Sequence, residues 1–380
     1  MNTTKPTSIK MVDLHGQYLQ IKSEIDAAIA EVLRSTAFIQ GPQVNLFAGA
    51  LSQYLQNVKV IPCANGTDAL QISMMAAGLK QGDEIILPVH TYVATAEVMA
   101  LLGLVPVFID VDEKNFTLDV TQIRSKLTPR TKAIVPVHLY GQCADMEAIL
   151  NIASEHNLLV IEDVAQGLGA SYTFTNGTVK RAGAMGHIGC TSFFPSKNLG
   201  CFGDGGAIFT PDEALAQKIH MIANHGQKIK YQHDLVGVNS RLDTMQAAIL
   251  LVKLKYLDDY TEKRNAAANF YDLHLHDVAF LDVPVRASFS SHVFHQYTLR
   301  TKGIDRDHFK KYLADAGVPT MIYYPIPLHL QAAYRRPGFG EGSFPVTERL
   351  ARTIISLPIH TEMTEPELSY ICGVIRAYHA

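Results

Sequence analysis

The stretch VKVIPCANGTDALQISMMAAGLKQGDEIILPVHTYVATAEVMALLGLVPVFID (residues 58–110) alternates short apolar runs with helical patterns. Its spacing predicts three strands and two helices, at 58–63, 84–88 and 105–110 and at 67–79 and 95–104. Further strands at 132–137 and 158–163, with a helix at 145–155 between them, continue the pattern. Continuously apolar strands separated by helices form parallel sheets that are covered on both faces. The sequence therefore predicts an α/β fold with a mostly parallel central sheet.

The remainder of the chain predicts a smaller α+β domain. Residues 243–275 have helical spacing over most of their length and contain no glycine or proline, so we expect a helical connection between two domains. Strand candidates at 294–300 and 320–324 alternate with helical stretches beyond it. We therefore expect a large domain over 41–255 and a small C-terminal domain over 256–380.

Residues 1–40 precede the predicted large domain. Apolar side chains recur there at helical spacing, which predicts a helix at about 17–34. This helix has no sheet of its own to cover. We expect it to pack on the small domain or on a neighbouring subunit.

The composition excludes several classes of partner. The 33 basic and 36 acidic residues give a net charge of −3, so the chain has no electrostatic footprint for nucleic acid or for an anionic membrane. Charged residues make up only 18% of the chain, which favours an oligomer that hides part of its surface. No apolar run reaches membrane-span length, the first residues lack a secretory signal, and the five cysteines are scattered without a C-x-x-C pair. We therefore expect a cytoplasmic protein without a disulfide framework or a metal site.

Five loops beyond the strands carry candidate chemistry, since open α/β sheets bind ligands at the carboxyl ends of their strands. The first loop is Asn65-Gly66-Thr67-Asp68. Its glycine allows close approach of the backbone, and the following helix offers free N–H groups to a phosphate. The alternative is that Thr67 or Asp68 caps the helix, and this is compatible with phosphate binding.

The next two loops offer an aromatic ring and a carboxylate. Tyr92, in HTYVAT (90–95), is suited to stack on a flat heterocycle, or else is a core tyrosine. Glu162 and Asp163 end an apolar strand shortly before Gln166. A buried carboxylate needs a partner, either a protonated heterocycle nitrogen or a local salt bridge.

The fourth loop encloses a lysine. In SFFPSKNLG (192–200), followed by GDGG (203–206), Lys197 lies among apolar residues and glycines. A buried lysine has a lowered pKa and is a competent amine nucleophile, whereas most lysines extend to the surface. Ser192 and Ser196 add hydroxyl groups that suit a phosphate.

The fifth loop, GVNSRLD (237–243), adds the amide of Asn239 and the guanidinium of Arg241. Together the five loops supply what pyridoxal phosphate requires: phosphate donors, a stacking ring, a carboxylate for the pyridine nitrogen and a lysine for the aldehyde. All of them follow strands of one predicted domain. The sequence therefore predicts a pyridoxal phosphate site.

Nearly the whole chain, from about residue 11 to residue 367, resembles the sugar aminotransferases of the DegT/DnrJ/EryC1/StrS family. The stretches that carry the resemblance are CANGTDALQ, TYVATAEV, EDVAQGLGA, TSFFPSKNLGCFGDGGAIFT and NHGQKIKYQHDLVGVNSRLDTMQAAIL. The resemblance implies the fold type I architecture of pyridoxal-phosphate-dependent transferases, like that of aspartate aminotransferase.

The resemblance also implies the role of each site residue. Lys197 corresponds to the lysine that bonds to the cofactor and then moves the proton, and Asp163 to the partner of the pyridinium nitrogen. Gln166 corresponds to the residue that contacts the ring oxygen, and Tyr92 to the stacking aromatic. The implied phosphate ligands are Gly66, Thr67, Ser192 and, from the neighbouring subunit of a homodimer, Asn239.

Departures from the family pattern are small. Val164 stands where alanine is usual, and Ala223 stands where arginine often precedes N-H-G. The hairpin-like stretch 172–187 is longer than in many relatives, at the expected entrance of the site.

Other classes within and near the family fit the sequence less well. Some relatives carry histidine in place of the lysine and dehydrate the sugar, whereas position 197 here is lysine. A non-catalytic regulator is disfavoured because Lys197, Asp163 and Gln166 are all present, and no basic recognition helix is found. An amino-acid aminotransferase normally carries a small-domain arginine for the α-carboxylate, and 320–331 contains none.

The resemblance implies a ping-pong reaction in which L-glutamate converts pyridoxal phosphate to pyridoxamine phosphate, which then aminates a nucleotide-linked keto-sugar. The sequence is most similar to transaminases of UDP-2-acetamido-2-deoxy-3-keto-D-glucuronate, which form UDP-2-acetamido-3-amino-2,3-dideoxy-D-glucuronate for bacterial O-antigen. The alternatives are a dTDP-3-keto-6-deoxyhexose and a UDP-4-keto-6-deoxy-N-acetylhexosamine.

The candidate sugar contacts are Arg241, Tyr323 and Tyr324. A guanidinium pairs bidentately with a carboxylate, so Arg241 is a candidate clamp for the uronate, or else forms a structural pair with Asp243. Tyr323 stands where the uronate relatives commonly have histidine before the tyrosine of H-Y-P-I-P, and Tyr324 is that tyrosine.

Overall fold

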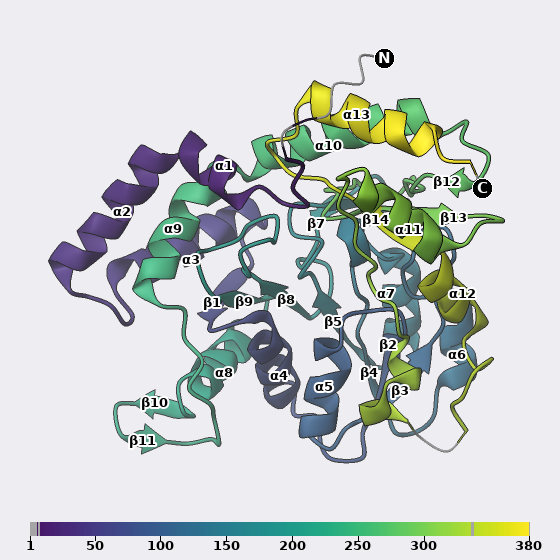
Figure 1. Ribbon diagram of the computed structural model, residues 1–380. Helices are drawn as coiled ribbons and strands as arrows, with labels where there is room; N and C mark the ends of the chain where they lie inside the picture. Colours follow the sequence, from purple (N-terminus) through teal and green to yellow (C-terminus); the bar gives the residue numbers. More distant parts are fainter. Residues whose placement is uncertain (1–5, 7, 336–337, 380) are drawn as a thin grey trace.

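The computed structural model describes residues 6, 8–335 and 338–379, and a seven-stranded sheet lies at its centre (Figure 1). The strands follow the order β1-β9-β8-β5-β4-β2-β3, and β9 runs antiparallel to both of its neighbours while the other pairs are parallel. Their bounds are β1 Lys59–Cys63, β2 Glu84–Pro88, β3 Val105–Ile109, β4 Thr131–Ile134, β5 Leu159–Asp163, β8 Ile188–Ser192 and β9 Gly206–Thr210. The predicted α/β fold with a mostly parallel sheet is confirmed.

Helices cover both faces of this sheet because its strands are apolar on both sides. In β2, Ile85 and Leu87 belong to one buried cluster and Ile86 to another, as the alternation of strand side chains requires. The first cluster includes residues of α4 (Gly66–Ala76), α5 (Ala94–Leu101) and α8 (Glu213–Ala223). The second includes residues of α3 (Pro42–Tyr54), α7 (Met146–Glu155) and α9 (Thr244–Leu254).

The C-terminal part of the chain has a core of its own around a three-stranded antiparallel sheet, β12-β13-β14. Its elements are α10 Leu257–Leu275, β12 Leu281–Asp282, β13 Tyr297–Thr301, α11 Arg306–Asp315, α12 Pro345–Thr353, β14 Ile354–Leu357 and α13 Glu365–Arg376. The predicted α+β character is therefore confirmed. The helical segment predicted at 243–275 is two helices, α9 and α10, which break at Lys255 and Tyr256.

The strand predicted at 320–324 is wrong. Met321 makes one bridge to Ser356 of β14, but the chain then leaves the sheet. Tyr323 and Tyr324 pack against a cluster that contains Tyr140, and the Tyr140 hydroxyl donates to the carbonyl of Tyr323. The Tyr323 carbonyl therefore accepts from a side chain and not from the amide of a neighbouring strand.

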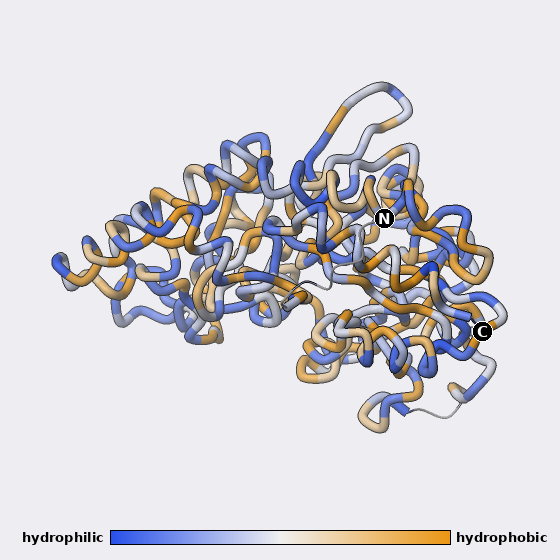
Figure 2. The backbone as a smooth tube through the Cα atoms, turned by 45° about the horizontal axis from the view of Figure 1, so that its top comes forward, coloured by the Kyte–Doolittle hydropathy of each residue, from blue (hydrophilic) through white to orange (hydrophobic). Residues whose placement is uncertain are grey.

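The N-terminal residues form α1 (Leu14–Gln20) and α2 (Lys22–Ser35). Ile21 and Ile25 pack on Ile249 and Val252 of α9, so within the single chain α2 lies on α9 and not on the small domain. The other expected location, a neighbouring subunit, stays a prediction. From α1, the side chain of Gln17 does reach the small domain, where it donates to the hydroxyl of Thr361 at 3.3 Å. Hydrophilic and hydrophobic residues alternate along α2, at the left of Figure 2, because one side of this helix is buried.

Two hairpins extend from the large domain. The predicted hairpin within 172–187 is confirmed as β6 (Ser171–Thr173) paired with β7 (Val179–Arg181). The second hairpin, β10 (Gln227–Ile229) and β11 (Gln232–His233), projects from the body at the lower left of Figure 1. Across the described residues, no helix is long and apolar enough to cross a membrane.

Candidate active site

Lys197 lies in a compact loop between β8 and β9. The amide of Cys201 donates to the carbonyl of Phe193 at 2.8 Å and closes the loop, while the amide of Lys197 donates to Phe194 O at 2.8 Å. The Lys197 side chain is partly buried, and this burial lowers its pKa from 10.5 to about 8, although the negative charge of Asp163 opposes the shift. Roughly a tenth of the amine is therefore uncharged at pH 7, several hundred times more than for a lysine with the ordinary pKa of 10.5, and the uncharged amine is the form that acts as a nucleophile.

Asp163, at the carboxyl end of β5, is a buried carboxylate that forms no salt bridge with any described residue. It is 6% exposed; Oδ2 accepts from the hydroxyl of Thr95 at 2.8 Å and Oδ1 from the amide of Ala165 at 3.1 Å. A buried anion with two neutral donors still has free acceptor capacity. This environment fits the protonated nitrogen of a pyridine ring, and the alternative of a local salt bridge at Asp163 is wrong.

The neighbouring Glu162 does form the local pair. Its side chain is fully buried, and Oε2 lies 2.9 Å from Nε2 of His138. His138 Nδ1 accepts from the amide of Ala144, so Nε2 carries the proton that is donated to Glu162. The amides of Gly183, Met185 and Gly186 also donate to this carboxylate at 2.6–2.9 Å. Glu162 is therefore saturated with structural contacts.

A phosphate cradle lies where α4 begins. Asn65 is the N-cap, since its side chain accepts from the amide of Asp68 at 2.8 Å, so the expectation that Thr67 or Asp68 caps the helix is wrong. The amides of Gly66 and Thr67 have no acceptor among the described residues. A Cβ on Gly66 would lie 2.7 Å from Cβ of Ser192, so only glycine allows this close approach. Ser192 Oγ accepts from Phe194 N and keeps its own proton free to donate.

Gln166 and Tyr92 complete the predicted set around the ring. Gln166 Oε1 accepts from the amide of Tyr140 at 2.8 Å, and Nε2 donates to the hydroxyl of Tyr324 at 3.1 Å, which leaves one N–H for a ring oxygen. Tyr92 is 56% exposed, with its ring 5.9 Å from that of Tyr324, so the alternative of a core tyrosine is wrong. The structure thus brings Tyr324 to the Gln166 side of the site.

Three supporting residues of this region were not identified from the sequence. Thr95 orients Asp163, Tyr140 orients Gln166, and His90 Nε2 lies 3.0 Å from the Tyr140 hydroxyl. Burial lowers the pKa of His90 to about 4, partly offset by Asp110, so this imidazole is neutral. Thr95 and His90 flank Tyr92 in the HTYVAT stretch. The spacing does not indicate that Thr95 contacts Asp163 or that His90 contacts Tyr140.

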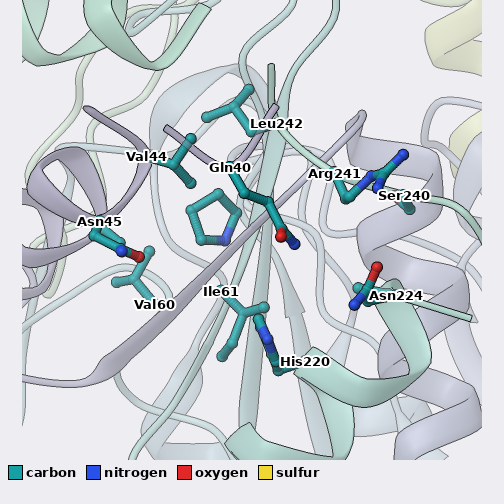
Figure 3. Close-up of a pocket in the computed structure, with 13 residues that line it drawn as sticks. Gln40, Val44, Asn45, Val60, Ile61, His220, Asn224, Ser240, Arg241 and Leu242 are labelled. Carbon is teal, nitrogen blue, oxygen red and sulfur yellow. The ribbon is translucent and has the colours of Figure 1, made fainter. Parts of the chain in front are cut away.

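Asn239 and Arg241 form no hydrogen bond with the other predicted site residues within the described part of the chain. Asn239 is exposed, and its side chain has no hydrogen-bond partner within the described residues. Arg241 lines a cavity of about 400 Å³ together with Gln40, Asn224 and His220, whereas Lys197, Asp163 and Tyr92 do not line it (Figure 3). Arg241 has no salt bridge with Asp243 or with another described acid, so the alternative of a structural ion pair is wrong.

The arrangement around Lys197 defines a class of protein. Four features lie at one edge of a mostly parallel sheet: the amine of lowered pKa, the carboxylate without a salt bridge, the glycine-lined amide cradle and the exposed ring. They fit pyridoxal phosphate group by group, as in the fold type I transferases. The match of residues 19–376 to the model of the DegT/DnrJ/EryC1/StrS aminotransferase family then narrows the class, and the chain belongs to this family.

Individual relatives agree with this assignment over nearly their full lengths. The chain is 46% identical over 367 residues to UDP-2-acetamido-2-deoxy-3-oxo-D-glucuronate aminotransferase of Pseudomonas aeruginosa, covering 97% of this chain and 99% of the relative. It is 44% identical to a "pleiotropic regulatory protein" of Geobacillus stearothermophilus (98% and 99% covered). It is 41% identical to a UDP-N-acetyl-3-dehydro-alpha-D-glucosamine aminotransferase of Acidithiobacillus ferrooxidans (98% of both).

Solved structures agree in the same way. DesV of S. venezuelae superposes with a TM-score of 0.93 at 39% identity, covering 98% of both chains. Ntda of Bacillus subtilis, solved with bound pyridoxamine phosphate, gives 0.89 at 31% identity, covering 99% of this chain and 86% of the other. The chain is therefore a nucleotide-sugar aminotransferase whose cofactor is pyridoxal phosphate, with pyridoxamine phosphate as the aminated form.

Proposed function

We propose that this enzyme transfers the amino group of L-glutamate to UDP-2-acetamido-2-deoxy-3-keto-D-glucuronate, and so supplies an amino sugar for a surface polysaccharide such as O-antigen. The observation that carries the proposal is the 46% identity, over almost the whole chain, to the Pseudomonas enzyme of that name. Arg241 supports it, because this cation has no acid partner among the described residues and is free to pair with a sugar carboxylate.

The bound cofactor would supply an electron sink for the bond that breaks at the amino carbon. Asp163 would hold the proton on the ring nitrogen, because its carboxylate accepts only from two neutral donors and forms no salt bridge with a described residue. Lys197 Nζ would bond to the cofactor and then carry the proton to and from the reacting carbon. Gly66, Thr67 and Ser192 would hold the phosphate, while Tyr92 would cover the ring and Gln166 would donate to its oxygen.

The substrate is tested by running the second half-reaction backwards. We expect the pyridoxal form to convert to the pyridoxamine form with UDP-2-acetamido-3-amino-2,3-dideoxy-D-glucuronate, followed by the change in visible absorbance. Conversion only by a dTDP-3-amino-6-deoxyhexose or a UDP-4-amino-6-deoxy-N-acetylhexosamine would refute the proposed substrate. Arg241→Ala should raise KM for the uronate roughly 10- to 100-fold, the loss of one charged hydrogen-bond pair. Lys218→Ala, which removes a partly exposed cation on α8, is the control.

We further propose a homodimer in which Asn239 and Arg241 serve the partner's site. Two observations support it: in one chain Arg241 lines a cavity that Lys197 does not line, and the β10–β11 region exposes apolar side chains. Ile229, Tyr231 and Val236 are 60%, 80% and 86% exposed, which is unusual for a free surface that projects into water. A second copy of the chain would cover them.

Subunit mixing tests this arrangement. Lys197→Ala and Asn239→Ala are each expected to have little activity alone, because one lacks the amine and the other a phosphate ligand. If Asn239 acts across the dimer, random exchange of the two variants forms one intact site in half of the dimers. Activity should then return to about a quarter of the wild-type value. No recovery after exchange, or a cofactor-loaded active monomer in light scattering, would contradict the shared site.

A further inference from the structure

The loop that carries Lys197 is compact and leaves little room for adjustment. Phe193 closes its base, since its amide donates to Gly205 O at 2.7 Å and its carbonyl accepts from Cys201 N at 2.8 Å. A Cβ on Gly200 would lie 2.3 Å from the carbonyl oxygen of Pro195. The backbone that follows Lys197 can therefore take this path only with glycine at position 200.

A second lysine, Lys253 of α9, contacts the backbone of this loop. It is only 2% exposed, and its Nζ donates to the carbonyl of Gly200 at 2.6 Å. It has no salt bridge among the described residues, and the ring of Phe202 lies 5.6 Å from Nζ. Burial, together with the positive charge of Arg264, lowers the pKa of Lys253 to about 8. Burying an amine without a carboxylate partner costs free energy of folding. This cost suggests that Lys253 has a function at the loop.

The same helix holds the loop at a second point. Gln246 Oε1 accepts from the amide of Phe202 at 2.9 Å, and Gln246 Nε2 donates to the carbonyl of Phe202 at 3.4 Å. Helix α9 therefore contacts the backbone at residues 200 and 202, three and five positions after Lys197. Lys255, two residues after Lys253, is exposed and pairs with Glu24 of α2 at 2.9 Å, so the loop contact belongs to Lys253 specifically.

We propose that Lys253 is a positioning residue for Lys197: by holding the Gly200 carbonyl, its buried amine fixes the depth of Lys197 and its orientation toward Asp163. Lys253 acts through geometry, because its charge is not among the causes of the shifted pKa of Lys197. The inference rests on the catalytic role of Lys197 and does not depend on which keto-sugar is the acceptor.

Lys253→Met, which keeps the length of the side chain and removes its donor, tests the proposal in the cofactor-free protein. The pKa of the Lys197 amine is measured from its rate of competitive labelling by acetic anhydride across pH, with mass spectrometry. The wild type should titrate at about 8. The variant should titrate nearer the ordinary value of 10.5, because the amine is less buried, and the amides of 193–205 should exchange hydrogen faster.

In the cofactor-loaded enzyme, the half-reaction rate with L-glutamate should fall roughly 10- to 100-fold with little change in KM, as expected for a misplaced catalytic group. Lys253→Gln, which keeps a donor, should lose less. Lys255→Met, at the C-cap of α9, should behave as wild type. A folded Lys253→Met protein with wild-type Lys197 pKa and rate, and only a lower melting temperature, would show a purely structural role and overturn the proposal. If Lys253→Met does not fold, Gln246→Ala releases the loop at Phe202 and is judged by the same pKa shift.

Discussion

The Lys197→Ala variant should lose the visible absorbance of the lysine-bound cofactor and all measurable turnover. The Lys197 amine has a pKa lowered to about 8 by burial, so it combines two roles, as the group that bonds to the cofactor and the group that moves the proton. Loss of proton transfer alone costs up to roughly 10⁴-fold in rate, and loss of the covalent step adds to it. The measurement is single-turnover conversion of the pyridoxal form by L-glutamate.

The control for this experiment is Lys80→Ala, which removes an exposed lysine after α4 and should change neither absorbance nor rate. Cofactor retention should fall in Lys197→Ala but remain measurable at high pyridoxal phosphate, because the cradle of Gly66, Thr67 and Ser192 is intact. A Lys197→Ala protein that turns over at the wild-type rate would refute the assignment of the site.

The Asp163→Asn variant should keep its fold and lose activity by roughly 10²- to 10⁴-fold, because the amide cannot hold a proton on the ring nitrogen. The hydrogen bond with Thr95 can survive the change, since asparagine retains one oxygen. In the cofactor-free protein the pKa of Lys197 should fall below about 8, because the charge of Asp163 raises it. Asp163→Glu, which restores the charge, should recover part of the rate.

Glu162→Gln, one residue earlier, provides the matched contrast. This carboxylate accepts from His138 and from three backbone amides and has no free capacity for the cofactor. The substitution replaces one acceptor oxygen with an amide nitrogen and leaves buried donors without an acceptor, at about 1–3 kcal/mol each, so the free energy of unfolding should fall while the rate of the folded fraction stays near wild type. Equal loss of rate in both variants at equal stability would contradict the division of roles between Glu162 and Asp163.

The apolar runs within 58–163 predict five of the seven strands of the sheet, because strands of a covered parallel sheet are apolar along their whole length. They do not predict β8 or the antiparallel β9, which lie beyond residue 163. The apolar runs also place the functional loops, since the carboxyl ends of parallel strands share one edge. Seven site residues could therefore be proposed from the sequence: Lys197, Asp163, Gln166, Tyr92, Gly66, Thr67 and Ser192. Because all seven occur together, a cofactor site is a better interpretation than a separate structural role for each loop.

The partner of each polar group could not be predicted, because adjacent strand residues point to opposite faces and only the fold places groups on those faces. Glu162 and Asp163 are identical in type and neighbours in sequence, yet His138 and the amides of 183–186 reach only the first. The same applies to Arg241, whose separation from Lys197 depends on where the 237–243 loop returns to the large domain.

Helix α9 shows most clearly what the sequence alone determined and what the tertiary structure decided. The run LLVKLKYL (250–257) has the spacing of a buried helix that carries two lysines of the same chemical type. The sequence determined the helix and its apolar face. Only packing decided that Lys253 turns inward to the Gly200 carbonyl while Lys255 turns outward to Glu24, because residues two apart on a helix lie on different faces and meet different neighbours.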